Sequence, residues 1–491
     1  MFNNLTVILV VCFYFTILMV LGVRGYRKTK TFSDYILGSR KVGPILGAMN
    51  VGASDMSSWL LMGIPGAFYL YGMNQIWMVI GLIIGSYSGW KIIAKRLRVY
   101  TEIANDSLTV SSFLEHRYND TSKILRVITA AIIIFFFTIY IASGFVGSAK
   151  LFAEFFNLNY IYALLISAIA VVLYAFLGGF LAVSWADLLQ GLLMLFALII
   201  TPIAIIFKTG DFSSTISSIK ATSPQHLNIF YDTSIVGIIS ALAWGLGYFG
   251  QPHIISKFMA IEKISYIKTS TRICIAWMII SLIGAVLVGL IGYQYFIGRS
   301  LERHETVFIV ASAEIFPPII LGVLIAAILA AIMSTINSQI LICCSALAED
   351  FYKRFFRKNA EDKELLITTR ISVAIITIIA VLIATDENLT ILSLVAHAWA
   401  GLGASIGPII IMSLFWKKTT KLGAIAGVVS GGLGAIFFSI YFTDSIFSYE
   451  LFPAFVLSLI CIVIFSLIDK NGPPKNAEAE LELVKQKISH G

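Results

Sequence analysis

Long apolar segments alternate with short polar ones along the whole chain of 491 residues. A helix needs about 20 apolar residues to cross the hydrocarbon core of a bilayer, and thirteen segments meet that requirement. They begin near Leu5, Gly43, Tyr71, Val127, Tyr160, Leu188, Ser234, Ile273, Pro317, Ile371, Leu389, Lys421 and Glu450. The pattern predicts an all-α polytopic membrane protein with thirteen transmembrane helices. The composition agrees, because 58% of the residues are hydrophobic and only 13% are charged.

The placement of lysine and arginine predicts the orientation of the chain. When successive loops are assigned alternately to the two sides of the membrane, all but five of the 35 Lys and Arg residues fall on one side. The five exceptions are Lys150, Lys208, Lys220, Arg299 and Arg303. Because basic loops stay in the cytoplasm, we expect the N-terminus outside and the C-terminus inside. The net charge of +8 then reflects contact with anionic lipid, and nucleic-acid binding is not expected.

The residue types that commonly catalyse reactions or bind metal ions are scattered along the chain. The five cysteines lie in or beside apolar segments, and the six histidines show no zinc-site spacing, with only His397 deep in a span. No pairing of nucleophile and base and no phosphate loop is present, so an enzyme is not expected. Residues 469–491 are short and polar, and we expect them to form a frayed cytoplasmic helix.

One carboxylate, Asp55, lies inside the second apolar segment. A charge near the bilayer centre costs roughly 2.5 to 3.5 kcal/mol, so it persists only where it faces a cavity or a partner. The surrounding residues, 52–58, are rich in Gly, Ala and Ser, which favour an interruption of the helix that frees oxygen atoms to bind an ion. The alternative is a buried Asp paired with a basic side chain of a neighbouring helix.

The seventh segment is interrupted in the same way, by three glycines and a proline within residues 243–252. Spans two to six and seven to eleven would then form two inverted halves of five helices. We therefore expect an extra helix and basic loop in residues 1–42, repeats in 43–208 and 234–416, two further helices in 421–468 and the tail in 469–491. The alternative reading of the glycines is close helix packing.

Ala331, Ser334, Thr335 and Ser338 share one face of the ninth span, which contains no ionisable side chain except two cysteines. Their hydroxyls, with carbonyls of the interrupted second span, would form a neutral oxygen cage that suits sodium. Coupling to protons instead of sodium would require a titratable side chain on this face of the ninth span. Alternatively, the Ser and Thr side chains bond back to the preceding turn.

Four segments together resemble the sodium/solute symporter family: Gly52–Trp59, Gly178–Trp185, Trp244–Pro252 and Ala330–Thr335. The likeness extends to Tyr35–Gly38 and Asp350–Lys353, covers nearly the whole chain, and is closest to the bacterial proline-carrying members. The resemblance implies a leucine-transporter-like 5+5 inverted repeat with thirteen helices in the bacterial inner membrane.

The resemblance also implies a role for particular residues. Sodium would be held by the carbonyls of Ala53, Met56 and Ala331 and the hydroxyls of Ser334 and Thr335, with Asp55 beside them. The substrate would contact Ser57, Trp59, Tyr140, Trp244 and Tyr248, with Pro252 shaping the seventh helix. Trp244 and Tyr248, four residues apart, are expected on one face.

Asp187 would lie at the inner end of the fifth span, on the ion pathway or as an ordinary interfacial carboxylate. Ser58, Ser338 and His397 depart from the usual family residues, and the role of His397 stays open. The implied function is import of L-proline coupled to Na⁺, with membrane lipid as surroundings and no obligate protein partner. The alternatives are symport of pantothenate, a monocarboxylate or a sugar, and ligand sensing on the same fold.

Overall fold

The structure, a computed structural model, describes residues 4–177, 179–299, 301–442 and 449–490. Gly178, the first residue of one of the four family-like segments, lies outside the described residues. Within the described part, the chain is helical apart from its connections and one isolated β-bridge between Val42 and Ile261.

The helices follow one another along the chain as α1 (Asn4–Lys28), α2 (Phe32–Leu37), α3 (Pro44–Asp55), α4 (Ile64–Tyr71), α5 (Ile76–Ser88), α6 (Lys95–Ile103), α7 (Val110–Arg117), α8 (Ile124–Phe156), α9 (Tyr160–Leu177), α10 (Phe180–Thr209), α11 (Phe212–Thr222), α12 (Ile235–Leu242), α13 (Pro252–Ala260), α14 (Ile264–Tyr295), α15 (Val307–Ile315), α16 (Pro318–Ser345), α17 (Lys353–Phe355), α18 (Asp362–Ile383), α19 (Ile391–Phe415), α20 (Lys421–Tyr441), α21 (Leu451–Ile468) and α22 (Ala477–His490). Tighter 3₁₀ turns include η3 (Gly72–Gln75), η6 (Ala243–Phe249) and η7 (His304–Thr306), and wider π-helical turns include η2 (Trp59–Gly63) and η8 (Ala346–Tyr352).

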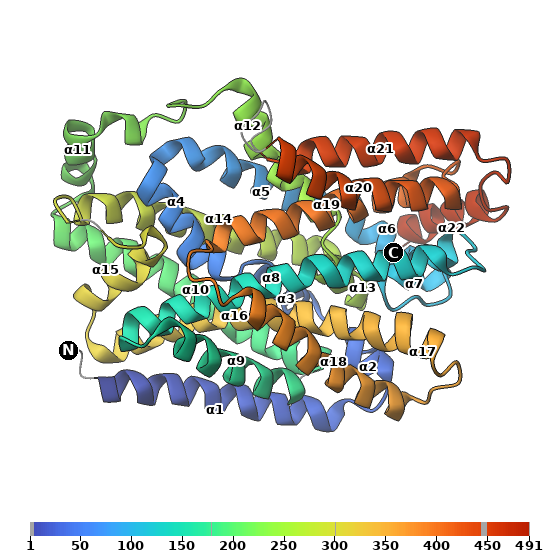
Figure 1. The fold of residues 1–491 in the computed structure, drawn as a ribbon, viewed down its shortest axis with the longest axis horizontal. Helices are drawn as coiled ribbons and strands as arrows, with labels where there is room; N and C mark the ends of the chain where they lie inside the picture. Colours follow the sequence, from blue (N-terminus) through green and yellow to red (C-terminus); the bar gives the residue numbers. More distant parts are fainter. Residues whose placement is uncertain (1–3, 178, 300, 443–448, 491) are drawn as a thin grey trace.

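Ten helices among the described residues are long and apolar enough to cross a membrane, or eleven if the bent pair around residue 250 is counted as one span. The long helices lie side by side, with α2, α7 and α17 at one end of the bundle and α11 and α15 at the other (Figure 1). In α16 and α19, 83% of the most apolar stretch is buried, compared with 28% in α1 and 33% in α18. The core of the bundle is therefore built around α16 and α19, and α1 and α18 lie at its periphery.

Both predicted interruptions are confirmed. Helix α3 ends at Asp55, the chain is extended at Met56 (φ −94°, ψ 93°), and the helix resumes as η2 at Trp59. The second interruption separates η6 from α13 by a bend of 43°. Here Gln251 is extended (φ −82°, ψ 108°) because a residue before proline avoids the helical region, and Pro252 then starts α13, where its missing N–H is not needed.

The sixth apolar segment begins earlier than predicted. Helix α10 starts at Phe180, after an extended Gly179, and not near Leu188. Asp187 consequently lies two turns inside α10, so the prediction that it ends the preceding span is wrong.

The C-terminal tail is docked onto the bundle, which corrects the prediction of a frayed helix. Leu481 and Val484 of α22 are buried, the Tyr100 hydroxyl of α6 donates to Glu480 at 2.9 Å, and Lys417 pairs with Glu478 at 2.6 Å. The tail therefore contacts both α6 and the connection between α19 and α20.

Lys150 was expected in an outer loop but is buried within α8. Its ammonium lies 2.7 Å from Glu305 of η7 and donates to the carbonyl of Leu389 at 2.8 Å. The other oxygen of Glu305 accepts the backbone N–H of Ile391 at 2.8 Å. This pair ties α8, η7 and the start of α19 together.

Candidate functional site

The interruption of α3 packs directly against α16. The Ser334 hydroxyl of α16 donates to the carbonyl of Ala53 at 2.7 Å and lies 3.0 Å from the carbonyl of Ala331. The last carbonyls of a helix have no partner within the helix, which leaves the Ala53 oxygen available for this contact. The structure therefore brings together three of the predicted oxygen ligands, from two segments about 280 residues apart in sequence.

Thr335 lies next to this contact with its hydroxyl buried and, among the described residues, without a hydrogen-bond partner. A buried polar group left unpaired costs about 1–3 kcal/mol, so the position favours a ligand that uses this oxygen. Met56 is also buried, directly after the end of α3. Neutral carbonyl and hydroxyl oxygens of this kind fit a hard monovalent cation such as Na⁺.

Asp55 is paired with the second interrupted span. The Tyr248 hydroxyl of η6 donates to one oxygen of Asp55 at 2.6 Å, and the other oxygen is buried without a partner in the described part of the chain. The alternative of a basic partner is therefore wrong for the described residues: the partner is a phenol. This hydrogen bond joins the two interruptions at the centre of the bundle.

Three further predicted residues gather at the interruption of α3. The Trp59 indole N–H donates to the carbonyl of Asp55 at 3.2 Å. The buried Tyr140 hydroxyl of α8 lies close to Ser57 and Trp59 and within electrostatic reach of Asp55, yet among the described residues it has no hydrogen-bond partner of good geometry. An aromatic wall with unpaired polar groups beside a carboxylate is suited to a small ligand with one apolar face.

Trp244 does not share a face with Tyr248, contrary to the prediction. Residues 243–249 form a 3₁₀ helix, in which a spacing of four corresponds to a rotation of about 120° because a turn contains 3.0 residues. Tyr248 therefore reaches Asp55, whereas Trp244 stacks on Tyr449 with ring centroids 4.7 Å apart and an interplanar angle of 16°.

The Trp244–Tyr449 stack borders a cavity of about 650 Å³. The polar side chains around this cavity include His397 and Glu450, which lie 2.6 Å apart, and Asp232. Tyr248, Tyr140 and Trp59 do not line it. Tyr449 and Glu450 were not among the predicted residues, because nothing in the apolar pattern distinguishes a loop aromatic that covers a site.

Pro252 is buried at the first position of α13, where it starts the helix. The preceding Gln251 side chain donates to the carbonyl of Trp399 at 3.1 Å, which holds the bend against α19. Pro252 therefore shapes the seventh span as predicted, and its direct contact with a substrate stays a prediction.

Asp187 forms a buried ion pair with Lys257 of α13 at 2.7 Å, and the same ammonium lies 3.1 Å from the Ser338 hydroxyl of α16. Both charged side chains are almost completely shielded from solvent, with exposures of 0% and 4%. The assignment of lysines to loops missed this partner. The position of Lys257 five residues after Pro252, and so within the second half of the interrupted span, was the signal available in the sequence.

The chain is similar to several known transporters. Residues 35–431 match the profile of the sodium:solute symporter family. The high-affinity proline transporter PutP of Bacillus subtilis is 47% identical, over 92% of this chain and 96% of its own. The sodium/proline symporter of Escherichia coli is 44% identical, over 94% and 92%. A solved Na⁺-coupled sialic acid symporter in a substrate-bound outward-open state has a TM-score of 0.81 at 18% identity, covering 95% of this chain and 98% of that one, which shows a shared fold.

Proposed function

Because the chain belongs to the sodium:solute symporter family, we propose that it imports L-proline together with Na⁺ by alternating access. The observation that carries this function is the near-full-length identity of 47% and 44% to two proline transporters. The oxygen cluster of Ala53, Ala331 and Ser334 supports the coupling ion. The protein is accordingly a membrane transporter of the bacterial plasma membrane.

In the proposed mechanism, Na⁺ is held by the carbonyls of Ala53, Met56 and Ala331 and the hydroxyls of Ser334 and Thr335. Asp55 contributes negative charge beside this site. Binding of the ion would hold α3 against α16. Because Tyr248 is hydrogen-bonded to Asp55, fixing the end of α3 would also fix the position of the seventh span. Ion and substrate affinities are then coupled reciprocally.

Proline would bind where the two interruptions meet. Its apolar ring packs on the aromatic faces of Trp59, Tyr140 and Tyr248, and its secondary ammonium is attracted to those faces. Ser57 and the free backbone N–H groups of the interruption are available to its carboxylate. Trp244 and Tyr449 border the cavity of about 650 Å³ through which the substrate would approach, and the indole of Trp244 would also contact the bound proline ring.

The energetics are sufficient for accumulation. One Na⁺ crossing about 100 mV releases roughly 2.3 kcal/mol, and a tenfold Na⁺ gradient adds about 1.4 kcal/mol. One-to-one coupling therefore sustains a proline ratio on the order of 500-fold at its limit.

We further propose the thirteen-span, 5+5 inverted-repeat architecture, with the repeats in residues 43–208 and 234–416. Gly72, with φ 78°, supports division of residues 59–103 into two spans, because this left-handed backbone ends α4 before α5 begins. Helix α9 supplies a further span. With the basic loops inside, the N-terminus is outside and residues 469–491 are cytoplasmic.

Asp187, held by Lys257, is proposed to lie on the path of Na⁺ toward the cytoplasm. Ser338, which contacts Lys257, is one turn along α16 from Ser334. The ion pair would then have to loosen for the ion to leave.

Purified protein in proteoliposomes tests the function directly. Radiolabelled proline should accumulate when an inward Na⁺ gradient is imposed, and Li⁺, K⁺ or H⁺ gradients should have little effect. Asp55→Asn should abolish this uptake, whereas Asp211→Asn, at the exposed start of α11, should leave it intact. Preference for pantothenate, a monocarboxylate or a sugar over proline would contradict the proposed substrate, and ligand binding without uptake would indicate a sensor.

A further inference from the structure

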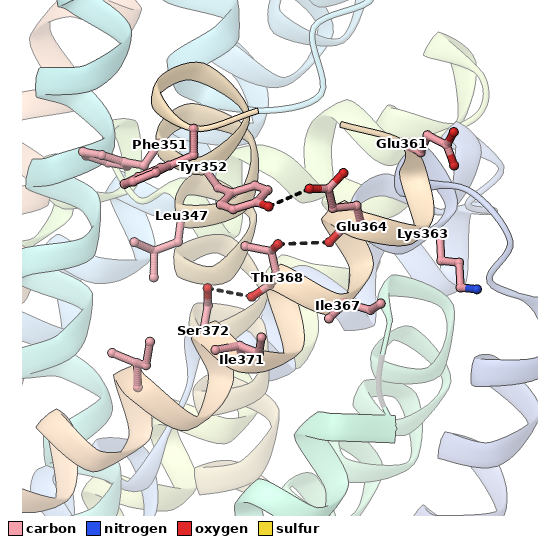
Figure 2. Close-up of a pocket in the computed structure, with 12 residues that line it drawn as sticks. Leu347, Phe351, Tyr352, Glu361, Lys363, Glu364, Ile367, Thr368, Ile371 and Ser372 are labelled. Carbon is pink, nitrogen blue, oxygen red and sulfur yellow. Dashed lines mark hydrogen bonds between the residues drawn. The ribbon is translucent and has the colours of Figure 1, made fainter. Parts of the chain in front are cut away.

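A groove of about 610 Å³ separates α18 from η8, the continuation of α16. Its deep part is apolar, with Leu347 and Phe351 on one side and Ile367 and Ile371 on the other (Figure 2). Ile375 of α18 also lines it. Hydrogen bonds from Thr368 and Ser372 to backbone carbonyls one turn earlier satisfy the hydroxyls that line the groove. The groove therefore offers an apolar surface to its occupant.

The groove faces the hydrocarbon of the membrane. Ile367, Ile371 and Ile375 are about half exposed in the bundle, at 48%, 57% and 49%, and they lie on a helix that is itself a candidate span. Eight residues of helix correspond to about 12 Å, close to the roughly 15 Å that one leaflet contributes to the hydrocarbon core. The apolar part thus matches the length of one acyl chain in one leaflet.

Acidic and basic side chains line the groove at its polar end. Glu361 and Lys363 line it at the start of α18 (Figure 2), and neither side chain has an ion-pair or hydrogen-bond partner within the part of the chain that the structure describes. Glu364, by contrast, accepts from the Tyr352 hydroxyl at 2.6 Å and pairs with Arg357 at 3.3 Å. One unpaired cation and one unpaired carboxylate therefore remain available to a bound molecule.

We propose that this groove is a binding site for a phospholipid whose head group carries both a phosphate and a primary ammonium, namely an ethanolamine phospholipid. Lys363 binds the phosphate and Glu361 accepts hydrogen bonds from the ammonium. A choline head group has no N–H to donate, and the negative head group of a glycerol phospholipid meets Glu361 as a like charge. One acyl chain fills the apolar groove.

The site adjoins the helix that carries the proposed ion ligands. Leu347 and Phe351 belong to η8, which continues α16 beyond Ser345. Arg126 of α8 holds the same turn through Asp350 and, at 3.0 Å, Glu349. A bound lipid therefore packs against the C-terminal end of α16. Lipid composition is thereby coupled to the helix that holds Ser334 and Thr335.

Native mass spectrometry of the full chain tests the site without relying on transport. The protein is offered equal amounts of ethanolamine, choline and glycerol phospholipids with identical acyl chains. The parent should retain the ethanolamine lipid about five-fold more than either other lipid, as expected for an interfacial ion pair of about 1 kcal/mol. Equal retention of the three lipids overturns the proposal.

Variants separate the two ends of the site. Glu361→Gln, at an exposed position, should abolish the preference for ethanolamine, and Lys363→Gln should lower retention of all three lipids. Ile371→Trp should also lower retention of all three, because the indole fills the groove. Matched controls are Ile378→Trp, which is exposed on α18 outside the groove, and Lys470→Gln, and both should retain lipid as the parent does. A Glu361→Gln protein with an unchanged preference contradicts the assignment.

Discussion

Removing one partner of the Asp187–Lys257 pair should destabilise the protein strongly. The two groups are 2.7 Å apart and almost completely buried, and loss of one partner from a buried pair costs about 3–5 kcal/mol because the other charge is left without compensation. For a chain of 491 residues, 1 kcal/mol corresponds to about 1 °C of melting temperature, so Asp187→Asn and Lys257→Met should each lower the apparent Tm by about 3–5 °C.

The double variant distinguishes pairing from other effects of each substitution. Asp187→Asn combined with Lys257→Met leaves no buried charge at this position, so its apparent Tm should return to within about 1 °C of the parent, since neutral replacement of a buried pair is often tolerated. The assay is thermal unfolding of detergent-purified protein followed by intrinsic fluorescence. Arg299→Gln serves as the control, because it breaks an exposed pair with Glu314 and should change the Tm by about 1 °C or less.

Transport by the same double variant tests the proposed ion pathway. If Asp187 lies on the path of Na⁺, the stable double variant should still require several-fold more Na⁺ for half-maximal proline uptake. If each single variant has the same apparent Tm as the parent, the assignment of Asp187 and Lys257 as a buried ion pair is refuted. A double variant with normal Na⁺ dependence would leave the pair as a structural feature and remove Asp187 from the pathway.

Three further predictions concern the hydroxyl groups of α16, the indole of Trp244, and Asp120 in the loop before α8. Ser334→Ala and Thr335→Ala should raise the Na⁺ requirement of proline binding at least ten-fold, about 1.4 kcal/mol or more for a lost ion ligand, with binding recovered at high Na⁺; normal Na⁺ dependence in both would exclude α16 from the site. Trp244→Ala should raise the proline concentration for half-maximal uptake by about 10- to 100-fold, for a buried aromatic contact of about 1–3 kcal/mol, while Na⁺ binding measured without proline stays constant; unchanged proline affinity would remove Trp244 from the substrate path. Asp120 has a pKa below its usual value: burial raises it, but hydrogen bonds from Ser122 and the Leu125 N–H and the ammonium of Lys421 outweigh burial. A depressed folded pKa contributes stability above the unfolded value of about 3.9 that is lost as the pH falls through the folded pKa, so thermal unfolding from pH 6 to pH 3 should show a steeper loss for the parent than for Asp120→Asn, and parallel curves would contradict this assignment.

The interruptions could be predicted from the sequence because glycine and proline act locally on the backbone. Pro252 sets the conformation of the residue before it wherever the segment lies. The face formed by Ala331, Ser334 and Thr335 was equally accessible, since regular α-helical geometry fixes which residues point together.

The winding of residues 243–249 could not be predicted in this way, because it depends on close contacts with other helices. A side-chain carbon at Gly247 would lie 1.8 Å from the Trp399 indole nitrogen, and one at Gly245 would lie 2.2 Å from the carbonyl oxygen of Gly81. These neighbours are distant in sequence, so the different directions of Trp244 and Tyr248 follow from tertiary packing.

The pairing of Asp187 with Lys257 was missed because of the way in which basic residues were assigned. Counting basic residues by side treats each lysine as part of a loop, whereas Lys257 is shielded by its place in the second half of an interrupted span. The stack of Trp244 on Tyr449 was missed for a related reason: a loop residue next to a predicted span has no periodic pattern that reveals its contacts.

The contacts of Lys150 have a consequence for synthesis of the chain in the cell. Glu305 and Leu389, which receive its ammonium, are 155 and 239 residues later in the sequence. At about 5–20 residues per second, the ribosome needs roughly 12–48 s after Lys150 before Leu389 emerges. During that interval the lysine must be solvated by water, lipid head groups or an insertion factor. The end of α8 and the start of α19 therefore come together only late in translation.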